Sequence, residues 1–293
     1  MTAAAPSTSE LRGRALITGA TSGIGRQTAL ALVRQGWEVF ATGIERDRFA
    51  ALEQEAGPGL VALYLDVTDP ASIAAAHAEV QARTHGHSID VLINNAGYGA
   101  AGPTESFNDA AVQAQFEVNV FGLLRVVRAF VPDLRAKRQG RVINISSLGG
   151  LFTLPMLGVY NATKYAVEAL SDALRMELRP FGIEVVLIEP AMIHTGFADR
   201  SMREAKKLED PSSPYAPIMA ESAALRAEME RTAYPVHHVV AAIERAIYAA
   251  RPRARYAAPR RAGWAVAVLR MLPTWLLDAI LSRLAGLSAL RGR

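Results

Sequence analysis

Hydrophobic runs and longer amphipathic segments alternate along the chain as far as Thr195. The β-branched and apolar runs predict strands at Arg14–Thr18, Glu38–Thr42, Leu60–Asp66, Val91–Asn94, Gly140–Ile145 and Ile183–Glu189. Helical spacing predicts helices near Gly25–Gln35, Pro70–His85, Ala110–Lys137 and Val159–Arg179. This alternation is typical of an α/β protein, so we expect a Rossmann-like, doubly wound parallel sheet with helices on both faces.

The pattern changes after Thr195. Residues 197–235 are polar and irregular, which favours a lid inserted over a substrate site, with disorder as the alternative, and a helix follows at Val236–Ala250. Residues 261–293 predict a C-terminal amphipathic helical extension. Charged residues and Pro273 interrupt it, so no apolar run reaches the roughly 20 residues that span a bilayer. A packed cap is favoured over a membrane-surface anchor.

Composition limits the class of protein. The 293 residues are 51% hydrophobic and 20% charged, enough for a large core and too apolar for general disorder. We expect a flexible N-terminus over residues 1–13, which has no apolar leader, and a single dinucleotide-binding catalytic domain over residues 14–260. The absence of cysteine excludes disulfides and thiolate chemistry and fits a cytoplasmic location, with membrane association as the alternative.

Net charge and histidine spacing limit the ligands and partners that we expect this protein to bind. The net charge is +4, and the excess is concentrated in five arginines between residues 251 and 261. These indicate a solvated surface or attraction to an anionic membrane or cofactor phosphate, and no base-reading motif accompanies them, so we expect no nucleic-acid partner. The six histidines show no ligand spacing with Asp, Glu or Cys, so we expect no metal site.

A glycine-rich turn follows the first predicted strand. Thr18 to Gly25 reads T-G-A-T-S-G-I-G and leads directly into a helix. Glycine is needed where a backbone turns sharply or approaches a phosphate, and the free N–H groups of a helix N-terminus favour an anion. The turn therefore predicts a nucleotide-phosphate site that includes Gly19, Ser22, Gly23, Ile24 and Gly25.

Further polar or small residues stand where the predicted strands end. Asp66 could accept a hydrogen bond from an adenine amino group, or it could cap the following turn. Asn95, Ala96 and Gly97 follow the fourth strand and leave room for a ligand. Open α/β sheets bind ligands at the carboxyl ends of their strands, where Gly19, Asp66, Asn95, Ser147 and Pro190 all fall.

A phenol and an amine lie four residues apart at Tyr160 and Lys164, with Ser147 thirteen residues upstream. On a helix this spacing places both side chains on one face. A cation at about 4 Å is worth roughly 4 kcal/mol at an effective dielectric of about 20. That would draw the phenol pKa down from ~10 toward the range where a proton donor and acceptor is most effective. Ser147, or as an alternative Ser146, could hold a substrate oxygen.

Together these motifs resemble the short-chain dehydrogenase/reductase family from about Arg14 to Thr195. Its motifs occur here in the family's order: the glycine turn, Asp66-Val67, Asn94-Asn95-Ala96-Gly97, Ser147 and Tyr160-Asn161-Ala162-Thr163-Lys164. The closer likeness, through Asn95–Gly99 and Phe116–Leu123, is to the hydroxysteroid and retinol dehydrogenase-like branch.

The resemblance implies roles for these residues. Tyr160 is expected as the general acid/base, Lys164 lowers its pKa and binds the nicotinamide ribose, Ser147 orients the substrate oxygen, and Asn119 holds a water. Asp66, Val67, Asn95, Ala96, Gly97, Pro190, Ile193 and Thr195 are expected to contact the cofactor. Ala191 departs from the family's usual glycine after the proline. The helices near Ala110–Lys137 and Val159–Arg179 imply a homodimer or homotetramer.

The residues after the second strand bear on the cofactor. NAD-preferring members usually have an acid at the position of Gly43, and NADP-preferring members commonly have arginine at that of Ile44. Neither is present, and the displaced Arg46 favours NADP, with NAD as the alternative. We expect an oxidoreductase that interconverts a secondary alcohol and a ketone on a lipophilic, steroid- or retinoid-like substrate. The alternative is an NAD(P)-binding sensor without turnover.

Overall fold

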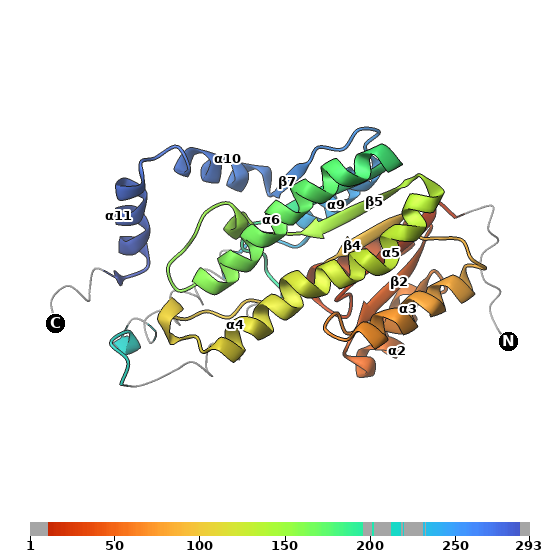
Figure 1. Cartoon of the computed structure of the whole chain (residues 1–293), viewed down its shortest axis with the longest axis horizontal. Coiled ribbons are helices and arrows are strands. Elements are labelled where there is room, and N and C mark those ends of the chain that lie inside the picture. Colours follow the sequence, from red (N-terminus) through yellow and green to blue (C-terminus); the bar gives the residue numbers. More distant parts are fainter. Residues whose placement is uncertain are drawn as a thin grey trace.

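A seven-stranded parallel sheet forms the centre of the computed structural model, which describes residues 11–195, 201, 212–217, 219, 231 and 233–287 (Figure 1). The strand order is β3-β2-β1-β4-β5-β6-β7. The strands are β1 (Gly13–Ile17), β2 (Trp37–Gly43), β3 (Leu60–Tyr64), β4 (Val91–Asn94), β5 (Gly140–Ile145), β6 (Ile183–Pro190) and β7 (Arg255–Ala258). The chain proceeds outward from β1 to β3 and then returns to β4 on the other side of β1, so the topological switch point lies between β1 and β4.

Helices cover both faces of the sheet, as predicted. The helices are α1 (Gly23–Arg34), α2 (Phe49–Ala56), α3 (Pro70–Arg83), α4 (Asp109–Phe116), α5 (Leu123–Lys137), α6 (Gly158–Leu178), α9 (His237–Tyr248), α10 (Arg260–Leu269) and α11 (Thr274–Leu284). Figure 1 shows α3, α5 and α6 on the near face, with α9 behind the sheet. Successive strand residues alternate between two cores, so Leu16 packs toward α3 and α5 while Ile17 packs toward α1 and α9.

The structure differs from the sequence prediction in three elements. The helix expected over Ala110–Lys137 is divided by a π-helical segment, Glu117–Gly122, between α4 and α5. Helix α2 and strand β7 were not predicted, because both are short and β7 has no apolar run of its own. The six predicted strands are present at nearly the expected positions.

The C-terminal extension forms two helices at the left-hand end of the molecule in Figure 1. Only Val266 of α10 and Leu281 of α11 are buried, so most of each helix surface lies outside the core. Within the described part of the chain, no helix has both the length and the apolar character needed to cross a membrane. Most of the predicted lid and of the flexible N-terminus lies outside the described residues.

Candidate active site

The glycine turn packs tightly against the end of β4. Gly19 has a positive φ of 64°, and a Cβ on Gly25 would lie 2.5 Å from both the Asn95 amide nitrogen and the Gly19 carbonyl oxygen. The Asn95 side chain donates hydrogen bonds to the carbonyl oxygens of Thr18 (2.9 Å) and Gly19 (3.0 Å). Asn95 therefore holds the turn in place from within the protein, a positioning role beside the cofactor contact predicted for it.

A cavity of about 550 Å³ opens in front of this turn. It is lined by side chains from the turn and α1, from the segment after β2, and from the segment after β6: Thr21, Ser22, Gly23, Arg26, Gln27, Asp47, Arg48, Ala51, Leu52, His194, Thr195 and Val236. Ser22 precedes α1 and makes no side-chain capping hydrogen bond, so the first N–H groups of that helix remain available to a ligand. A cavity at a helix N-terminus with arginines in its wall fits the phosphates of a dinucleotide.

Some of the residues predicted to contact the cofactor line this cavity, and others lie away from it. Ser22, Gly23 and Thr195 line the cavity, whereas Ile24 and Ile193 pack against the core behind it. The Arg46 guanidinium stacks at 4.0 Å over the ring of Tyr64 and does not line the cavity. Sequence reasoning missed Arg26 and Arg48, although Arg26 follows the last glycine of the turn directly.

Residues that follow β3 and β4 hydrogen-bond and pack against neighbouring segments of the protein. The Asp66 carboxylate accepts hydrogen bonds from the Thr68 N–H (2.8 Å) and hydroxyl (2.7 Å), which is the capping role left open above. Val67 packs beneath Gly122, and the Ala96 N–H donates to the Thr18 hydroxyl (3.0 Å). An adenine contact by Asp66 remains a prediction.

Ser147, Tyr160 and Lys164 come together where β5 ends and α6 begins. The Ser147 hydroxyl contacts the Tyr160 phenol and donates to the Pro190 carbonyl oxygen at 3.5 Å, and the Gly149 N–H donates to the Ser147 oxygen at 3.0 Å. The buried Lys164 amine donates to the Ile145 carbonyl (2.9 Å) and lies 5.9 Å from the centre of the Tyr160 ring. Ser146, the alternative serine, is buried and its hydroxyl has no hydrogen-bond partner among the described residues, whereas Ser147 contacts the phenol.

The direction of the Tyr160 pKa shift differs from the sequence prediction. Burial raises the pKa of Tyr160, and the Ser147 hydroxyl offsets only part of that rise. Burial also lowers the pKa of Lys164 to about 8, against the opposing effect of Glu168. The expected depression of the phenol pKa by Lys164 is therefore absent from the protein alone, because desolvation of the phenol dominates and the Lys164 amine hydrogen-bonds the Ile145 carbonyl.

Asn119 lies in the π-helical segment and is buried. Its amide donates to the Tyr98 carbonyl (2.8 Å) and the Thr163 hydroxyl (3.0 Å), and its oxygen accepts from the Tyr98 N–H (3.0 Å). These bonds tie the segment after β4 to α6. They leave the side chain little capacity for the water predicted there, so such a water would depend on backbone groups.

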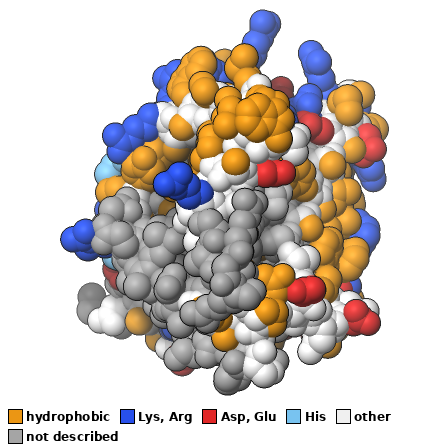
Figure 2. Space-filling model, turned by 90° about the vertical axis from the view of Figure 1, so that its left-hand side faces the viewer, with side chains coloured by type: hydrophobic (Ala, Val, Ile, Leu, Met, Phe, Trp, Pro, Cys, Tyr) orange, Lys and Arg blue, Asp and Glu red, His pale blue; other side chains and the backbone are white. Residues whose placement is uncertain are grey.

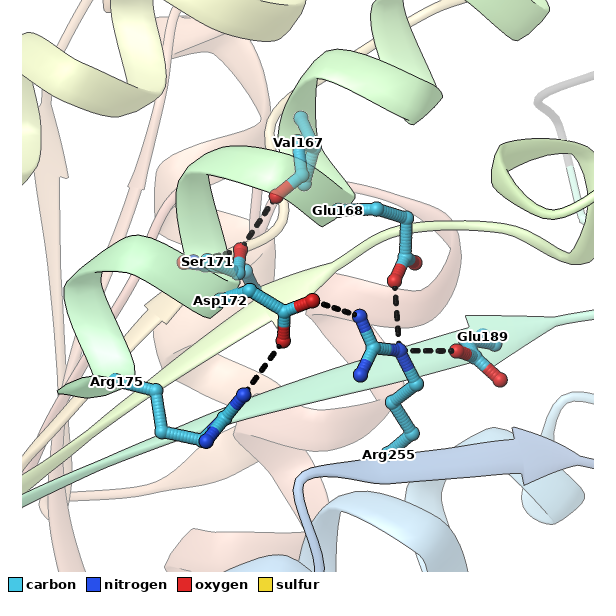
Figure 3. Close-up of polar contacts among 8 residues, drawn as sticks. Val167, Glu168, Ser171, Asp172, Arg175, Glu189 and Arg255 are labelled. Atoms are coloured by element: carbon cyan, nitrogen blue, oxygen red, sulfur yellow. Dashed lines mark hydrogen bonds and ion pairs between the residues drawn. The ribbon is translucent and has the colours of Figure 1, made fainter.

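An ionic cluster in which Glu168 and Glu189 are buried and Arg255 is partly exposed fixes the rest of α6 to the sheet (Figure 3). Arg255 of β7 contacts Glu168 (3.0 Å) and Asp172 (2.6 Å) of α6 and Glu189 of β6 (3.3 Å). Burial raises the pKa of Glu168 and, with the neighbouring Glu168 charge, raises that of Glu189 to about 7. Arg255, predicted as part of a surface or anion-attracting cluster, thus turns inward to join the helix of Tyr160 to the strand of Pro190.

A doubly wound parallel sheet with a glycine turn at its switch point is the architecture of dinucleotide-dependent enzymes, and the Ser147, Tyr160 and Lys164 side chains lie beside that point. The chain belongs to the short chain dehydrogenase family, whose model matches residues 14–206. It is an oxidoreductase of that family, as the sequence motifs predicted.

Relatives extend the likeness over most of the chain. It is 37% identical to the uncharacterized oxidoreductase YbbO of Escherichia coli strain K12, over 91% of this chain and 93% of the relative. It is 33% identical to the NADPH-dependent 3-dehydrocapnine reductase of Ornithobacterium rhinotracheale, over 91% and 95%. Human 17-beta-hydroxysteroid dehydrogenase type 1 is 39% identical over 67% of this chain and 61% of that enzyme, in line with the predicted branch.

A solved structure shows the same fold. The short chain dehydrogenase/reductase of Burkholderia phymatum, in complex with NAD, superposes with a TM-score of 0.78 at 25% identity, covering 89% of this chain and 94% of the other.

Proposed function

We propose that this protein interconverts a secondary alcohol and a ketone with NADP(H) as the hydride carrier. The observation that carries the proposal is the meeting of Ser147, Tyr160 and Lys164 at the carboxyl end of β5, on the same edge of the parallel sheet as the cavity at the glycine turn. The residues present fit such a group, since the N-terminus of α1, which has no side-chain cap, and the Arg48 side chain border the cavity that its phosphates would occupy. When bound, the nicotinamide supplies or accepts the hydride.

The protein's own residues manage the proton. During reduction, hydride adds to the carbonyl carbon and the Tyr160 phenol gives its proton to the carbonyl oxygen, so that an alcohol forms; oxidation reverses both transfers. The Ser147 hydroxyl, which contacts the phenol, would donate to the same substrate oxygen in place of its long bond to the Pro190 carbonyl. Lys164, charged below a pKa of about 8, stabilises the phenolate left behind.

Three observations support NADP over NAD. A Cβ on Gly43 would lie 2.7 Å from the Thr21 methyl, so the acidic side chain that would hold a ribose diol is excluded there. Arg48 lines the cavity and has no ion-pair partner among the described residues, which suits it to a 2′-phosphate. The relative from Ornithobacterium rhinotracheale is NADPH-dependent by name.

A lipophilic substrate fits the residues around the triad. Leu151 and Leu154 are half-buried in the segment between Ser147 and α6, and Met192 is exposed just past Pro190. The hydroxysteroid dehydrogenase among the relatives supports a substrate of this class.

We also propose that two copies associate through α5 and α6. Three exposed apolar side chains lie on or immediately beside these helices, namely Phe121, Tyr165 and Met176. Exposed apolar side chains on two adjacent long helices provide the kind of surface that a symmetric dimer buries.

A turnover screen tests the proposed reaction. Purified protein is offered a panel of steroid, retinoid and long-chain ketones while NADPH consumption is followed, and NADPH affinity is measured by fluorescence. We expect the protein to turn over at least one ketone. Ser147→Ala should lower kcat for that ketone at least about a hundredfold and leave NADPH affinity unchanged, because the substrate oxygen loses a hydrogen-bond donor in the transition state. The matched control is Thr153→Ala, an exposed position in the same segment. Tight NADPH binding with no turnover across the panel would instead support a sensor.

A further inference from the structure

The C-terminal helices present an apolar surface outward. Five of the eleven exposed large hydrophobic side chains among the described residues lie between positions 264 and 284: Trp264, Val268, Met271, Trp275 and Leu284. Trp264 is 70% exposed, Met271 84% and Trp275 71%. Scattered exposed apolar residues are ordinary, but a local concentration of this kind marks a contact surface.

The packing of α10 explains why these side chains face outward. A Cβ on Gly263 would lie 2.4 Å from the Ala257 methyl, so α10 approaches β7 closely at this glycine. Val266 is the buried residue of α10, whereas Trp264 and Val268 on either side of it are exposed. The helix is thus fixed to the sheet edge by its small and buried residues while the tryptophan face remains uncovered by the described residues.

Positive charge surrounds this surface. Arg260, Arg261, Arg270 and Arg283 are exposed on the same two helices and the turn between them, and Asp278 is the acidic residue of that stretch. Figure 2 shows hydrophobic side chains gathered toward the top of this end of the molecule, with Lys and Arg side chains, and some Asp and Glu side chains, at their margins. We name the five apolar side chains and four arginines together the C-terminal face.

We propose that the C-terminal face docks on the surface of an anionic lipid membrane. Tryptophan is the side chain enriched at the boundary between headgroups and acyl chains, and basic residues close to an anionic surface are attracted to it. Amphipathic helices that carry arginine beside tryptophan and leucine lie in that boundary without crossing the bilayer. A second copy of the chain fits less well, because a two-fold contact would place the arginines of one copy against those of the other.

The position of the C-terminal face also bears on substrate access. A recess of about 320 Å³ is lined by residues from the segments after β4 and β5 and, from just past α11, by Leu287. If the proposed reaction on a lipophilic substrate holds, docking would present this recess close to the membrane in which such a substrate dissolves. This step rests on the proposed function, whereas the docking itself does not.

Vesicle binding tests the docking without any turnover. The full chain is mixed with phosphatidylcholine vesicles with and without phosphatidylglycerol, and binding is measured by co-sedimentation and tryptophan emission. Trp37 is only 5% exposed, so a shift in emission reports on Trp264 and Trp275. We expect binding and a blue shift with the anionic vesicles, and at least about tenfold weaker binding for Trp264→Ser/Trp275→Ser and for Arg260→Gln/Arg283→Gln.

The control is Ile44→Ser, which removes an exposed apolar side chain outside both the C-terminal face and the proposed dimer contact and should bind as the unaltered protein does. Equal binding by the tryptophan variant or to neutral vesicles would overturn the proposal. So would a dimer that forms without vesicles and is lost in the tryptophan variant, since a second copy would then cover the face. Activity enters none of these measurements, so failure of docking is distinct from failure of the proposed reaction.

Discussion

At the scale of single residues, desolvation governs the chemistry of the site more than sequence spacing does. Tyr160 and Lys164 stand four residues apart on α6, yet burial raises the pKa of the phenol and lowers that of the amine. Both shifts favour the neutral forms of the two groups. The protein alone therefore holds a neutral phenol ready to donate, and a bound oxidised nicotinamide, which is cationic, would favour the phenolate needed for alcohol oxidation.

The lowered pKa of Lys164 predicts a pH dependence of stability. Because its pKa is about 8 when folded and about 10.4 when unfolded, the unfolded chain binds more protons between these values. The contribution of Lys164 to the free energy of unfolding should therefore rise with pH across that window. Urea unfolding of the protein and of Lys164→Met at a series of pH values measures it. We expect the protein to gain stability relative to the variant as pH increases, and parallel curves would contradict the pKa.

Arg48 should decide the choice of coenzyme. Removing a guanidinium from a phosphate forfeits a charge-assisted hydrogen bond, so Arg48→Ala should weaken NADPH binding about tenfold or more and leave NADH binding nearly unchanged. Arg46→Ala is the matched control, because that side chain stacks on Tyr64 outside the cavity. Fluorescence titration gives both affinities. An equal loss of affinity for the two coenzymes, or a larger loss of NADPH affinity for Arg46→Ala than for Arg48→Ala, would contradict the assignment of Arg48 to the 2′-phosphate.

At the scale of elements, helix α6, which carries Tyr160 and Lys164, is held by contacts at two points along its length. Asn119 ties its first turns to the segment after β4 through Thr163, and Arg255 ties its middle to β6 and β7. Both ties use buried polar groups, which are costly to leave unpaired and thus restrict the helix to one position. The phenol of Tyr160 is placed relative to Pro190 by these ties.

Loss of Arg255 should destabilise the protein most at neutral and higher pH. Arg255→Met leaves the carboxylates of Glu168 and Glu189 buried without their cation. We expect the free energy of unfolding to fall by about 3 kcal/mol, which is the low end of the range for a broken buried ion pair, because Arg255 is 34% exposed. Since the pKa of Glu189 is already about 7, both carboxyls hold protons more readily as pH falls, so the cost should shrink toward pH 5. Denaturant unfolding across this range checks the trend, with the exposed Arg253→Met as control. A cost independent of pH would show that the carboxyls do not titrate.

At the scale of the whole molecule, the fold follows from the sequence because each strand is a short apolar run and each turn carries its own signal. The glycine turn, the strand ends and the Ser147, Tyr160 and Lys164 spacing all identify one edge of the sheet. The sequence did not predict β7, since Arg255 to Ala258 has no apolar run, nor the break at Glu117–Gly122, since the helical pattern continues through it. Those elements depend on tertiary packing.

Parts of the site were beyond prediction for a similar reason. Arg46 and Arg48 are two residues apart in a short helical turn, so only the three-dimensional path shows which one lines the cavity. Glu168 and Glu189 gave no signal at all, because a glutamate on a helix or at a strand end is ordinarily solvated. Their burial depends on tertiary packing, in which Arg255 of β7 contacts both carboxylates.

The central claim is that Tyr160 transfers the proton in an oxidoreductase reaction beside a bound coenzyme, and Tyr160→Phe tests it most directly. With a ketone that the protein turns over, kcat for the variant is measured together with NADPH affinity. Proton transfer contributes about 10² to 10⁴ in rate, so we expect kcat to fall at least about a hundredfold while the affinity for NADPH changes little. Unchanged turnover in a variant that binds NADPH normally would contradict the assignment of Tyr160.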